Sequence, residues 1–323
     1  PGIQGGGFTE PSDPGLKGIW LDEYTLGAEK QFGRSLTVGL RGTYRTLDGA
    51  IEDRCDLDVS SPLTGYNSCG ITQTGSSGPM ARGDIPGCNG LDGITNYQCF
   101  DTIPPVPRAK RIYRGIEVLA RDAVSSRLWL QASYVYSSLR GNYDGEVSEG
   151  FGGQTSPGIN ADFDYYLYAD HNNYGRLYLD RPHSVRLDGY YMTPFNLSVG
   201  LQAYARSGAP LDRLGYFNQF YLSTIQLVPR GYAGRLPTEW EANLTLEYPI
   251  RIGPVSVTLQ GYLYNLFNNQ IRTQQDMRWS VGQPAGYPTS LYDPNQEQNN
   301  PYYGLVTDRQ AGRLFRAALR VSF

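Results

Sequence analysis

The sequence predicts an all-β protein, an antiparallel transmembrane β-barrel with long extracellular loops. Apolar and polar residues alternate along repeated segments of about ten residues, as barrel strands require. Short and long connections between these segments also alternate along the chain. No run approaches the roughly 18 consecutive apolar residues that indicate a transmembrane helix.

Composition alone leaves a soluble β domain open. The 323 residues carry 28 basic and 31 acidic side chains, and the mean hydropathy is −0.44. Lumen-facing polar residues lower the hydropathy of any barrel, so this value fits both classes. The balanced charge argues against a nucleic-acid partner, which requires a basic surface.

Nine segments read as strands, each close to the ~9–11 residues that cross a bilayer at a tilt. In segment 240–248 the even positions are apolar and the odd positions polar. Segments 197–205, 255–263 and 315–323 alternate as regularly. The others contain more exceptions to the pattern. In chain order the expected strands are 22–31, 35–46, 110–122, 128–140, 179–191, 197–205, 240–248, 255–263 and 315–323.

The connections favour a membrane barrel over a soluble sandwich. A sandwich has two equivalent ends, whereas a barrel has short periplasmic turns and long extracellular loops. Loops of this length are also uncommon in compact soluble domains. The short turns lie near 32–34, 124–127, 193–196 and 251–254, and the long loops at roughly 53–106, 142–177, 207–236 and 268–308.

The last strand sets the direction of the others. If it descends to the periplasm, counting back through nine strands places residues 1–20 outside the cell. Single-chain bacterial barrels have even strand numbers and begin in the periplasm. We therefore expect the chain, which starts at Pro1 without an initiator methionine, to be a processed product or a fragment of a longer protein.

Four cysteines, all in one Gly/Ser/Pro-rich stretch, suggest two disulfides and an oxidising compartment. Zinc binding is a weaker alternative, because the stretch has neither a CxxC pair nor a histidine. The simplest pairing joins neighbours, and the two other pairings stay open. The candidates are Cys55, Cys69, Cys88 and Cys99.

Eight segments, in this order, resemble the C-terminal barrel of TonB-dependent outer-membrane transporters, especially the Oar-like branch. Each segment alone is a weak signal, and their shared order is more specific. They are 22–30 (DEYTLGAEK), 111–118 (RIYRGIEV), 130–145 (LQASYVYSSLRGNYDG), 179–191 (LDRPHSVRLDGYY), 206–211 (RSGAPL), 228–237 (VPRGYAGRLP), 264–270 (YNLFNNQ) and 312–323 (GRLFRAALRVSF).

The resemblance implies a barrel of about 22 strands that holds an N-terminal plug. It also implies a bacterial outer-membrane location and opening by an inner-membrane TonB complex. On this basis residues 1–323 form a single unit, the C-terminal part of the barrel, and the plug and the N-terminal strands are absent.

Candidate ligand-binding residues come from one loop and from the polar faces of two strands. In the loop, Asp162, Asp164, Tyr165 and Tyr166 form an acidic and aromatic surface for an unknown extracellular ligand. Carboxylates could also hold calcium, but the rest of an EF-hand pattern is missing, so we predict no metal and no cofactor. The strand candidates are Tyr204, Arg206 and Tyr262.

The polar faces of the strands carry charges of both signs, which predicts cross-strand pairs along a wet lumen wall. A wall of this kind needs no further function to explain it. The charged residues expected to face the lumen are Arg41, Arg45, Glu117, Arg121, Arg186, Asp188, Arg206, Glu241, Glu247, Arg316 and Arg320.

The two histidines do not predict an enzyme. His183 lies beside Ser184 and close to Asp180, but neighbouring residues of a strand point to opposite faces, so these residues form no triad. His171 falls within a loop, where a solvated side chain is the simpler interpretation.

The terminal strand resembles the signal that barrel-assembly machinery recognises, an aromatic end after alternating apolar residues. Its candidate residues are Phe315, Leu319, Val321 and Phe323. The leading hypothesis for function is the barrel of a TonB-dependent transporter or receptor, in contact with outer-membrane lipid, whose loops bind cargo for energised uptake or export. The alternatives are a structural or adhesive barrel that displays disulfide-closed loops, and a passive porin.

Overall fold

The fold consists mainly of one large antiparallel sheet, with three two-stranded sheets in the long connections that the structure describes. The computed structural model describes residues 15–54, 70–75, 107–144, 172–216, 224–281 and 297–323. Within these ranges no helix is long and apolar enough to cross a membrane. The nine long strands are β1 (Trp20–Phe32), β2 (Leu36–Asp48), β5 (Arg111–Ser125), β6 (Leu128–Gly141), β8 (His183–Met192), β9 (Ser198–Arg206), β12 (Glu239–Ile252), β13 (Val255–Tyr264) and β16 (Leu314–Ser322).

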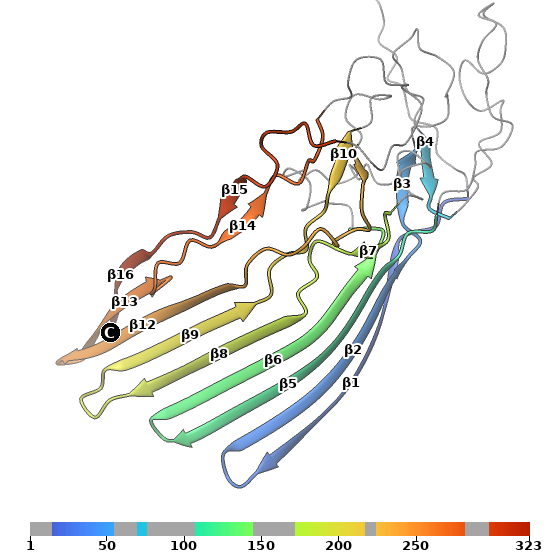
Figure 1. The fold of residues 1–323 in the computed structure, drawn as a ribbon. Coiled ribbons are helices and arrows are strands. Elements are labelled where there is room, and N and C mark those ends of the chain that lie inside the picture. Colours follow the sequence, from blue (N-terminus) through green and yellow to red (C-terminus); the bar gives the residue numbers. More distant parts are fainter. Residues whose placement is uncertain (1–14, 55–69, 76–106, 145–171, 217–223, 282–296) are drawn as a thin grey trace, which may run out of the picture.

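The long strands form a meander, in which each strand pairs with the next long strand of the chain. Their order in the sheet is β1-β2-β5-β6-β8-β9-β12-β13-β16, and every pairing is antiparallel. Figure 1 shows the sheet as one curved wall, with the short turns along one end and the long connections along the other. The predicted all-β antiparallel fold is confirmed.

Local sequence explains the short turns. Gly33 and Gly253 have positive φ values of 62° and 60°, a conformation that glycine adopts at no steric cost. Asn196 takes the same left-handed conformation with φ 69°, which asparagine tolerates better than most residues. In the turn between β5 and β6, Ser125 Oγ instead accepts hydrogen bonds from the backbone N–H groups of Arg127 and Leu128, at 3.2 and 3.1 Å.

The register sorts the side chains into one apolar and one polar face, because directly paired residues share a face. The ladder fixes this sorting across the whole width of the sheet. One row of paired residues runs Ala28, Leu40, Val118, Tyr134, Val185, Ala205, Trp240, and the next row runs Gly27, Arg41, Glu117, Val135, Ser184, Arg206, Glu239.

Burial is reversed relative to a soluble protein. On the apolar face Leu40, Ile116 and Leu187 are 56%, 54% and 47% exposed. The two clusters of buried hydrophobic residues among the described residues lie at the loop end of the sheet, around Ala50 and around Leu214. An apolar surface of this extent requires a cover, and lipid supplies one for a barrel.

Two expectations about element boundaries need correction. The strand expected at 179–191 begins at His183, because Asp180 turns into a buried polar network at the end of the sheet. The long connections also contain short strands that the sequence analysis missed. These are β3 (Ile51–Arg54), β4 (Gly70–Gln73), β7 (Gly175–Arg176), β10 (Leu214–Tyr216), β11 (Thr224–Gln226), β14 (Arg272–Gln275) and β15 (Val306–Arg309).

A matched pair of substitutions on β9 tests the two faces. Leu201→Arg places a charge on the apolar face, and it should lower the free energy of unfolding in lipid vesicles by about 2–4 kcal/mol. Gln202→Arg points the other way, beside Asp188, and it should change that free energy by less than about 1 kcal/mol. Denaturant titration in vesicles measures both effects, and equal losses would contradict the assignment of the faces.

Candidate functional site: the polar face and its loop assembly

Ion pairs that join neighbouring strands line the polar face. Arg45 Nε donates to Glu23 Oε2 at 2.8 Å, and Arg41 pairs with Glu117. Arg121 reaches across β2 to Glu29 on β1, with a distance of 2.8 Å between Nη2 and Oε1. The predicted mixed-sign cross-strand pairs are therefore present. Because exposed ion pairs contribute little stability, their main effect is to neutralise the wall.

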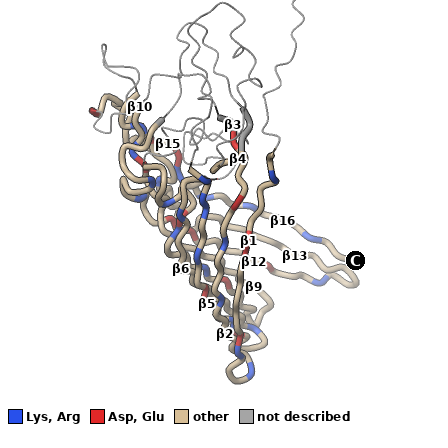
Figure 2. The backbone as a smooth tube through the Cα atoms, turned by 90° about the vertical axis from the view of Figure 1, so that its right-hand side faces the viewer, with Lys and Arg blue, Asp and Glu red and all other residues tan. Residues whose placement is uncertain are grey.

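Figure 2 marks the basic positions in blue and the acidic positions in red, and both recur along the strands. The charged residues that the sequence analysis assigned to the lumen all have the parity of the polar face. Arg206, for example, pairs directly with Ser184 and Glu239, and Glu241 pairs with Tyr204.

Two of the predicted ligand residues lie together at the loop end of β9. The guanidinium of Arg206 is 5.9 Å from the ring centroid of Tyr204. Its Nε and Nη2 atoms donate to Glu239 Oε2 at 2.9 and 2.6 Å. The Arg206 side chain is still 46% exposed, so part of its hydrogen-bonding capacity faces the open side of the wall.

Tyr262 shares the polar face but lies apart from that pair. It is opposite Arg316, whose guanidinium is 6.0 Å from its ring. Both Tyr262 and Gly200 pair with Thr245, so Tyr204 lies four residues closer to the loops. At ~3.3 Å per residue this separation is roughly 13 Å along the strand direction, with a further strand between them. The structure therefore does not bring all three predicted residues into one site.

Above the strands, the described parts of the long connections pack into a compact unit, which we call the loop assembly. Its hydrophobic core includes Leu211, Leu214, Leu236 and Met277, with Tyr178 packed against it. Polar networks surround this core. The loop assembly comprises residues 172–182, 207–216, 224–238, 265–281 and 297–313.

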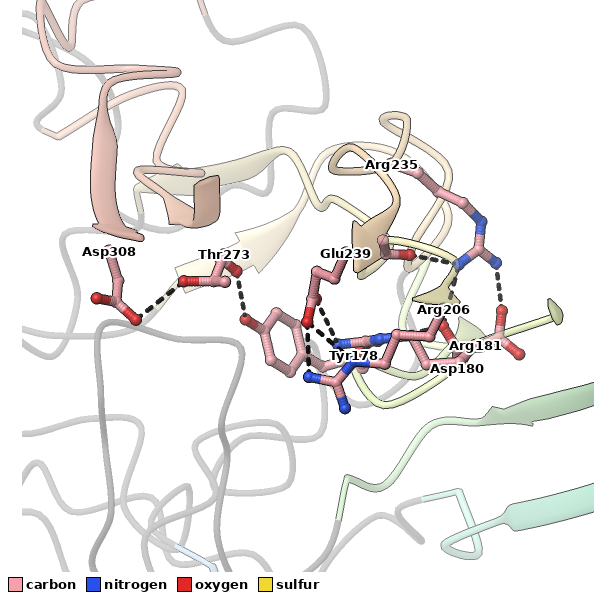
Figure 3. A network of polar contacts seen from close by, with 9 residues as sticks. Tyr178, Asp180, Arg181, Arg206, Arg235, Glu239, Thr273 and Asp308 are labelled. Atoms are coloured by element: carbon pink, nitrogen blue, oxygen red, sulfur yellow. Dashed lines mark hydrogen bonds and ion pairs between the residues drawn. The ribbon is translucent and has the colours of Figure 1, made fainter. Parts of the chain in front are cut away.

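One polar network attaches the loop assembly to the sheet (Figure 3). Glu239, at the start of β12 and only 3% exposed, accepts from Arg206 and faces Arg181 Nη2 at 3.9 Å. Asp180 is equally buried and pairs with Arg235. Its Oδ1 atom also accepts from the Leu139 backbone N–H at 2.7 Å. Burial lowers the pKa of the Arg181 guanidinium, which the charge of Glu239 partly offsets.

The same network extends to the hairpin of β14 and β15. Tyr178 Oη donates to the Thr273 carbonyl at 3.4 Å, and Thr273 Oγ1 donates to Asp308 at 2.9 Å. Connections that are distant in the sequence thus share one chain of contacts (Figure 3).

A second network is centred on Arg230, which is 2% exposed. Its Nη1 atom donates to Asp144 Oδ2 at 2.7 Å, and its Nε atom donates to Asn173 Oδ1 at 3.0 Å. Nearby, Asp212 accepts from the Gly231 backbone N–H. Burial raises the pKa of Asp212, and the charge of Arg230 opposes that shift. Buried charges of this kind are tolerated only when they are paired.

Just after β14, Asp276 and Arg278 form a local ion pair in the loop assembly. Burial opposes ionisation of Asp276, but hydrogen bonds from the Arg278 side chain and backbone outweigh it and lower the pKa of Asp276. The Arg278 Nη2 to Asp276 Oδ2 distance is 2.6 Å.

The sequence analysis did not identify these networks as sites, although four segments that carried the family resemblance supply several of their residues. Asp144 comes from 130–145. Asp180 and Arg181 come from 179–191, Arg206 comes from 206–211, and both Arg230 and Arg235 come from 228–237. The sequence feature that could have indicated these networks is the presence of charged residues beside glycine and proline in the long loops.

Several predicted residues lie outside the described part of the chain. They are the loop residues Asp162, Asp164, Tyr165 and Tyr166, and the disulfide candidates Cys55, Cys69, Cys88 and Cys99. Among the described residues, no group of three or more His, Cys, Asp or Glu side chains could hold a metal ion.

The residues of the proposed assembly signal share the apolar face. Phe315, Leu319 and Val321 pair with Leu263, Leu259 and Val257 of β13, and Phe323 follows the end of β16, fully exposed.

His183 also has the predicted orientation. It pairs directly with Tyr136, and its Nδ1 atom is 2.8 Å from Tyr134 Oη. Ser184 points to the other face, opposite Arg206. With Asp180 paired to Arg235, the three side chains cannot act as a triad.

Comparison with known proteins gives one relative by sequence. No protein-family model matches the chain. The chain is 27% identical over 296 residues to the TonB-dependent transporter Oar of Myxococcus xanthus, covering 87% of this chain and 24% of that protein. The chain thus spans about a quarter of the length of its curated relative.

The chain is similar to parts of several solved structures of outer-membrane transport proteins. The outer membrane transporter YddB from Escherichia coli has a TM-score of 0.48 at 12% identity, over 94% of this chain and 33% of that one. The ferric-catecholate import receptor Fiu from E. coli K12 has a TM-score of 0.44 at 12% identity, over 95% and 28%.

The sequence relative confirms the predicted resemblance to TonB-dependent transporters of the Oar-like branch. Together with the exposed apolar face, it places the chain in the bacterial outer membrane. Because the relative is a transporter, it also agrees with the prediction that the chain is not an enzyme.

Removing one charge tests how the loop assembly is attached. Glu239→Gln leaves Arg181 and Arg206 without their shared carboxylate, so the region should lose about 1–3 kcal/mol of local stability. Amide hydrogen exchange of residues 225–238 would measure this loss as faster exchange. Glu247→Gln is the matched control, since Glu247 accepts only from the neutral Gln260 in the described structure. Equal exchange in both variants would contradict the role of Glu239.

Proposed function

We propose that this chain is the late portion of the barrel of a TonB-dependent outer-membrane transporter, with outer loops that bind cargo. The sheet supports this proposal most directly, because one face is apolar and exposed and the other is polar and ion-paired. A soluble protein buries the first kind of face, whereas a transporter barrel turns it to lipid and lines its lumen with the second. The Oar relative supports the same reading.

The proposal implies that the chain is part of a longer natural protein. We propose that residues 1–323 form one unit, the C-terminal part of a barrel whose other strands and plug lie elsewhere in that protein. The plug would be the part that contacts the TonB complex. The open edges of the sheet at β1 and β16 are where further strands would pair.

For the cargo site, the polar face near the loop assembly has suitable chemistry. Tyr204 offers an aromatic surface, and Arg206 keeps an exposed guanidinium beside it. Tyr262 offers a second ring lower on the wall. We propose that the acidic and aromatic loop residues at 162–166 also contact the cargo. These groups suit a polar or aromatic cargo, taken up or exported with energy from the TonB complex.

Binding to TonB tests the proposal without knowledge of the cargo. The intact natural protein, folded in lipid nanodiscs, should bind the purified periplasmic domain of TonB in a surface-binding assay. A folded protein that shows no binding would contradict the proposal and favour the alternative of a structural or adhesive barrel.

Assembly of the barrel gives a separate test of the terminal strand. We propose that barrel-assembly machinery recognises Phe315, Leu319, Val321 and Phe323. Phe323→Ala should then lower the amount of heat-modifiable, folded protein in outer membranes severalfold, without changing synthesis. Phe195→Ala, in an exposed short turn on the same side of the membrane, is the matched control. Undiminished assembly of the Phe323 variant would rule out this recognition.

A further inference from the structure

We propose that the apolar face carries a binding site for a phosphorylated lipid of the outer leaflet, formed by Arg114, Arg140 and Arg176 at the loop end of β5, β6 and β7. The inference rests on the outer-membrane placement and goes beyond transport of cargo through the barrel. It assigns a function to charges on the side of the sheet that faces lipid.

The register places the three arginines on the apolar face. Arg114 pairs with Ser138 and lies two residues from Ile116, on the same side of β5. Arg140 is two residues beyond Ser138 and pairs directly with Arg176 of β7. Side chains that oppose each other directly have Cβ atoms about 4.5–5.5 Å apart, and diagonal neighbours are roughly 7–8 Å apart. The three guanidinium groups can therefore reach a common ligand.

These arginines differ in their partners from the four ion-paired arginines of the polar face. Arg41, Arg45, Arg121 and Arg206 each pair with a glutamate. No ion pair links Arg114, Arg140 or Arg176 to a carboxylate among the described residues.

Neither described acid at the loop end of β1 and β2 on this face neutralises the cluster, because Asp48 pairs with Arg108 and Asp22 is distant. Asp22 lies in the same cross-strand row as Arg140, but Thr46 and Ile112 come between them. At ~4.8 Å per strand, that places the two about 14 Å apart. Like charges that oppose each other directly are destabilising, so Arg140 and Arg176 favour an anion that neutralises both.

Aromatic residues place the cluster at the depth of lipid headgroups. Tyr24, Tyr44 and Tyr136 lie on the same face at this end of the strands, where barrels carry an aromatic girdle. Arg114 is level with Tyr44, 5.8 Å from its ring centroid. Arg140 and Arg176 lie two residues closer to the loops than the row of Tyr44 and Arg114, at the depth where phosphates of the outer leaflet are found.

Arg176 is itself held by a ring of the loop assembly. Its guanidinium is 4.4 Å from the centroid of Tyr232, and its backbone N–H donates to the Arg230 carbonyl at 2.9 Å. A guanidinium that stacks on a ring keeps its in-plane N–H groups available for an oxyanion.

A hollow that is lined in part by Arg114 suits the acyl part of such a lipid. It has a volume of about 860 Å³, and its lining includes Leu26, Ile116, Tyr24, Tyr44, Tyr136 and Arg114. Its lining also includes Gly42 and Ser138, whose small size leaves space there. A mostly apolar hollow that shares Arg114 with a basic cluster, for which the described residues offer no carboxylate partner, matches a molecule that carries phosphate and hydrocarbon together, rather than a free anion.

The test uses the intact natural protein in phosphatidylcholine nanodiscs, with purified lipid A as the probe and native mass spectrometry to count bound molecules. The triple variant Arg114→Gln, Arg140→Gln, Arg176→Gln should bind lipid A at least about tenfold more weakly, because each arginine near a membrane surface contributes on the order of 1 kcal/mol. The control variant Arg34→Gln, Arg127→Gln, Arg251→Gln removes the same charge at the short turns and should bind as the wild type does.

Two further readouts complete the design. Inorganic phosphate at millimolar concentration should not displace lipid A, and displacement would overturn the proposal in favour of a free-anion site. The single variant Arg140→Gln replaces the triple variant if the latter assembles poorly. Unchanged binding in a folded variant would refute the site. The arginine substitutions should leave TonB binding unchanged. If the wild-type protein itself does not bind TonB, the result counts against the proposed transporter and not against the lipid site.

Discussion

The structure depends on the hydrogen-bonded register that joins nine strands, and among these strands the register shifts only at the turn end of β5 and β6. Direct partners share a face, so a residue on β1 determines which face its partners present as far as β16. A shift of one residue at any ladder would move charges such as Arg41 and Arg206 onto the apolar face. The ion pairs of the polar face act against such a shift, since Arg41–Glu117 and Arg206–Glu239 form only in the observed register.

The loop assembly solves a different physical problem. Long connections without regular structure contain many backbone polar groups that require partners. Here, charged side chains supply them: the buried Asp180 accepts from the Leu139 N–H, and the half-buried Arg235 donates to the carbonyls of Asp180 and Gly208. These contacts tie residues distant in sequence to the ends of β6, β8 and β12. The same contacts hold Tyr204 and Arg206 at the boundary between wall and loops, where we propose that cargo binds.

The sequence predicted the strands well because a strand has a period of two that survives local exceptions. All nine expected segments correspond to long strands, and the turn residues Gly33 and Asn196 carry their own conformational signal. The start of β8 was misplaced because Leu179 and Asp180 fit the alternation of the following strand, whereas the tertiary contact between Asp180 and Arg235 holds Asp180 outside the sheet. The networks around Glu239 and Arg230 join residues that lie 33 to 86 positions apart. No local pattern encodes such pairs, although the charged loop segments that contain them were visible.

Solvent accessibility along β9, residue by residue, tests the central claim most directly. Single spin labels at positions 198 to 206 of the intact protein in bilayers should report a period of two by electron paramagnetic resonance. Val199, Leu201, Ala203 and Ala205 should be accessible to oxygen, which dissolves in lipid, and the intervening positions to a polar relaxation agent. Uniform accessibility to the polar agent along the strand would contradict a sheet that turns its apolar face to the membrane.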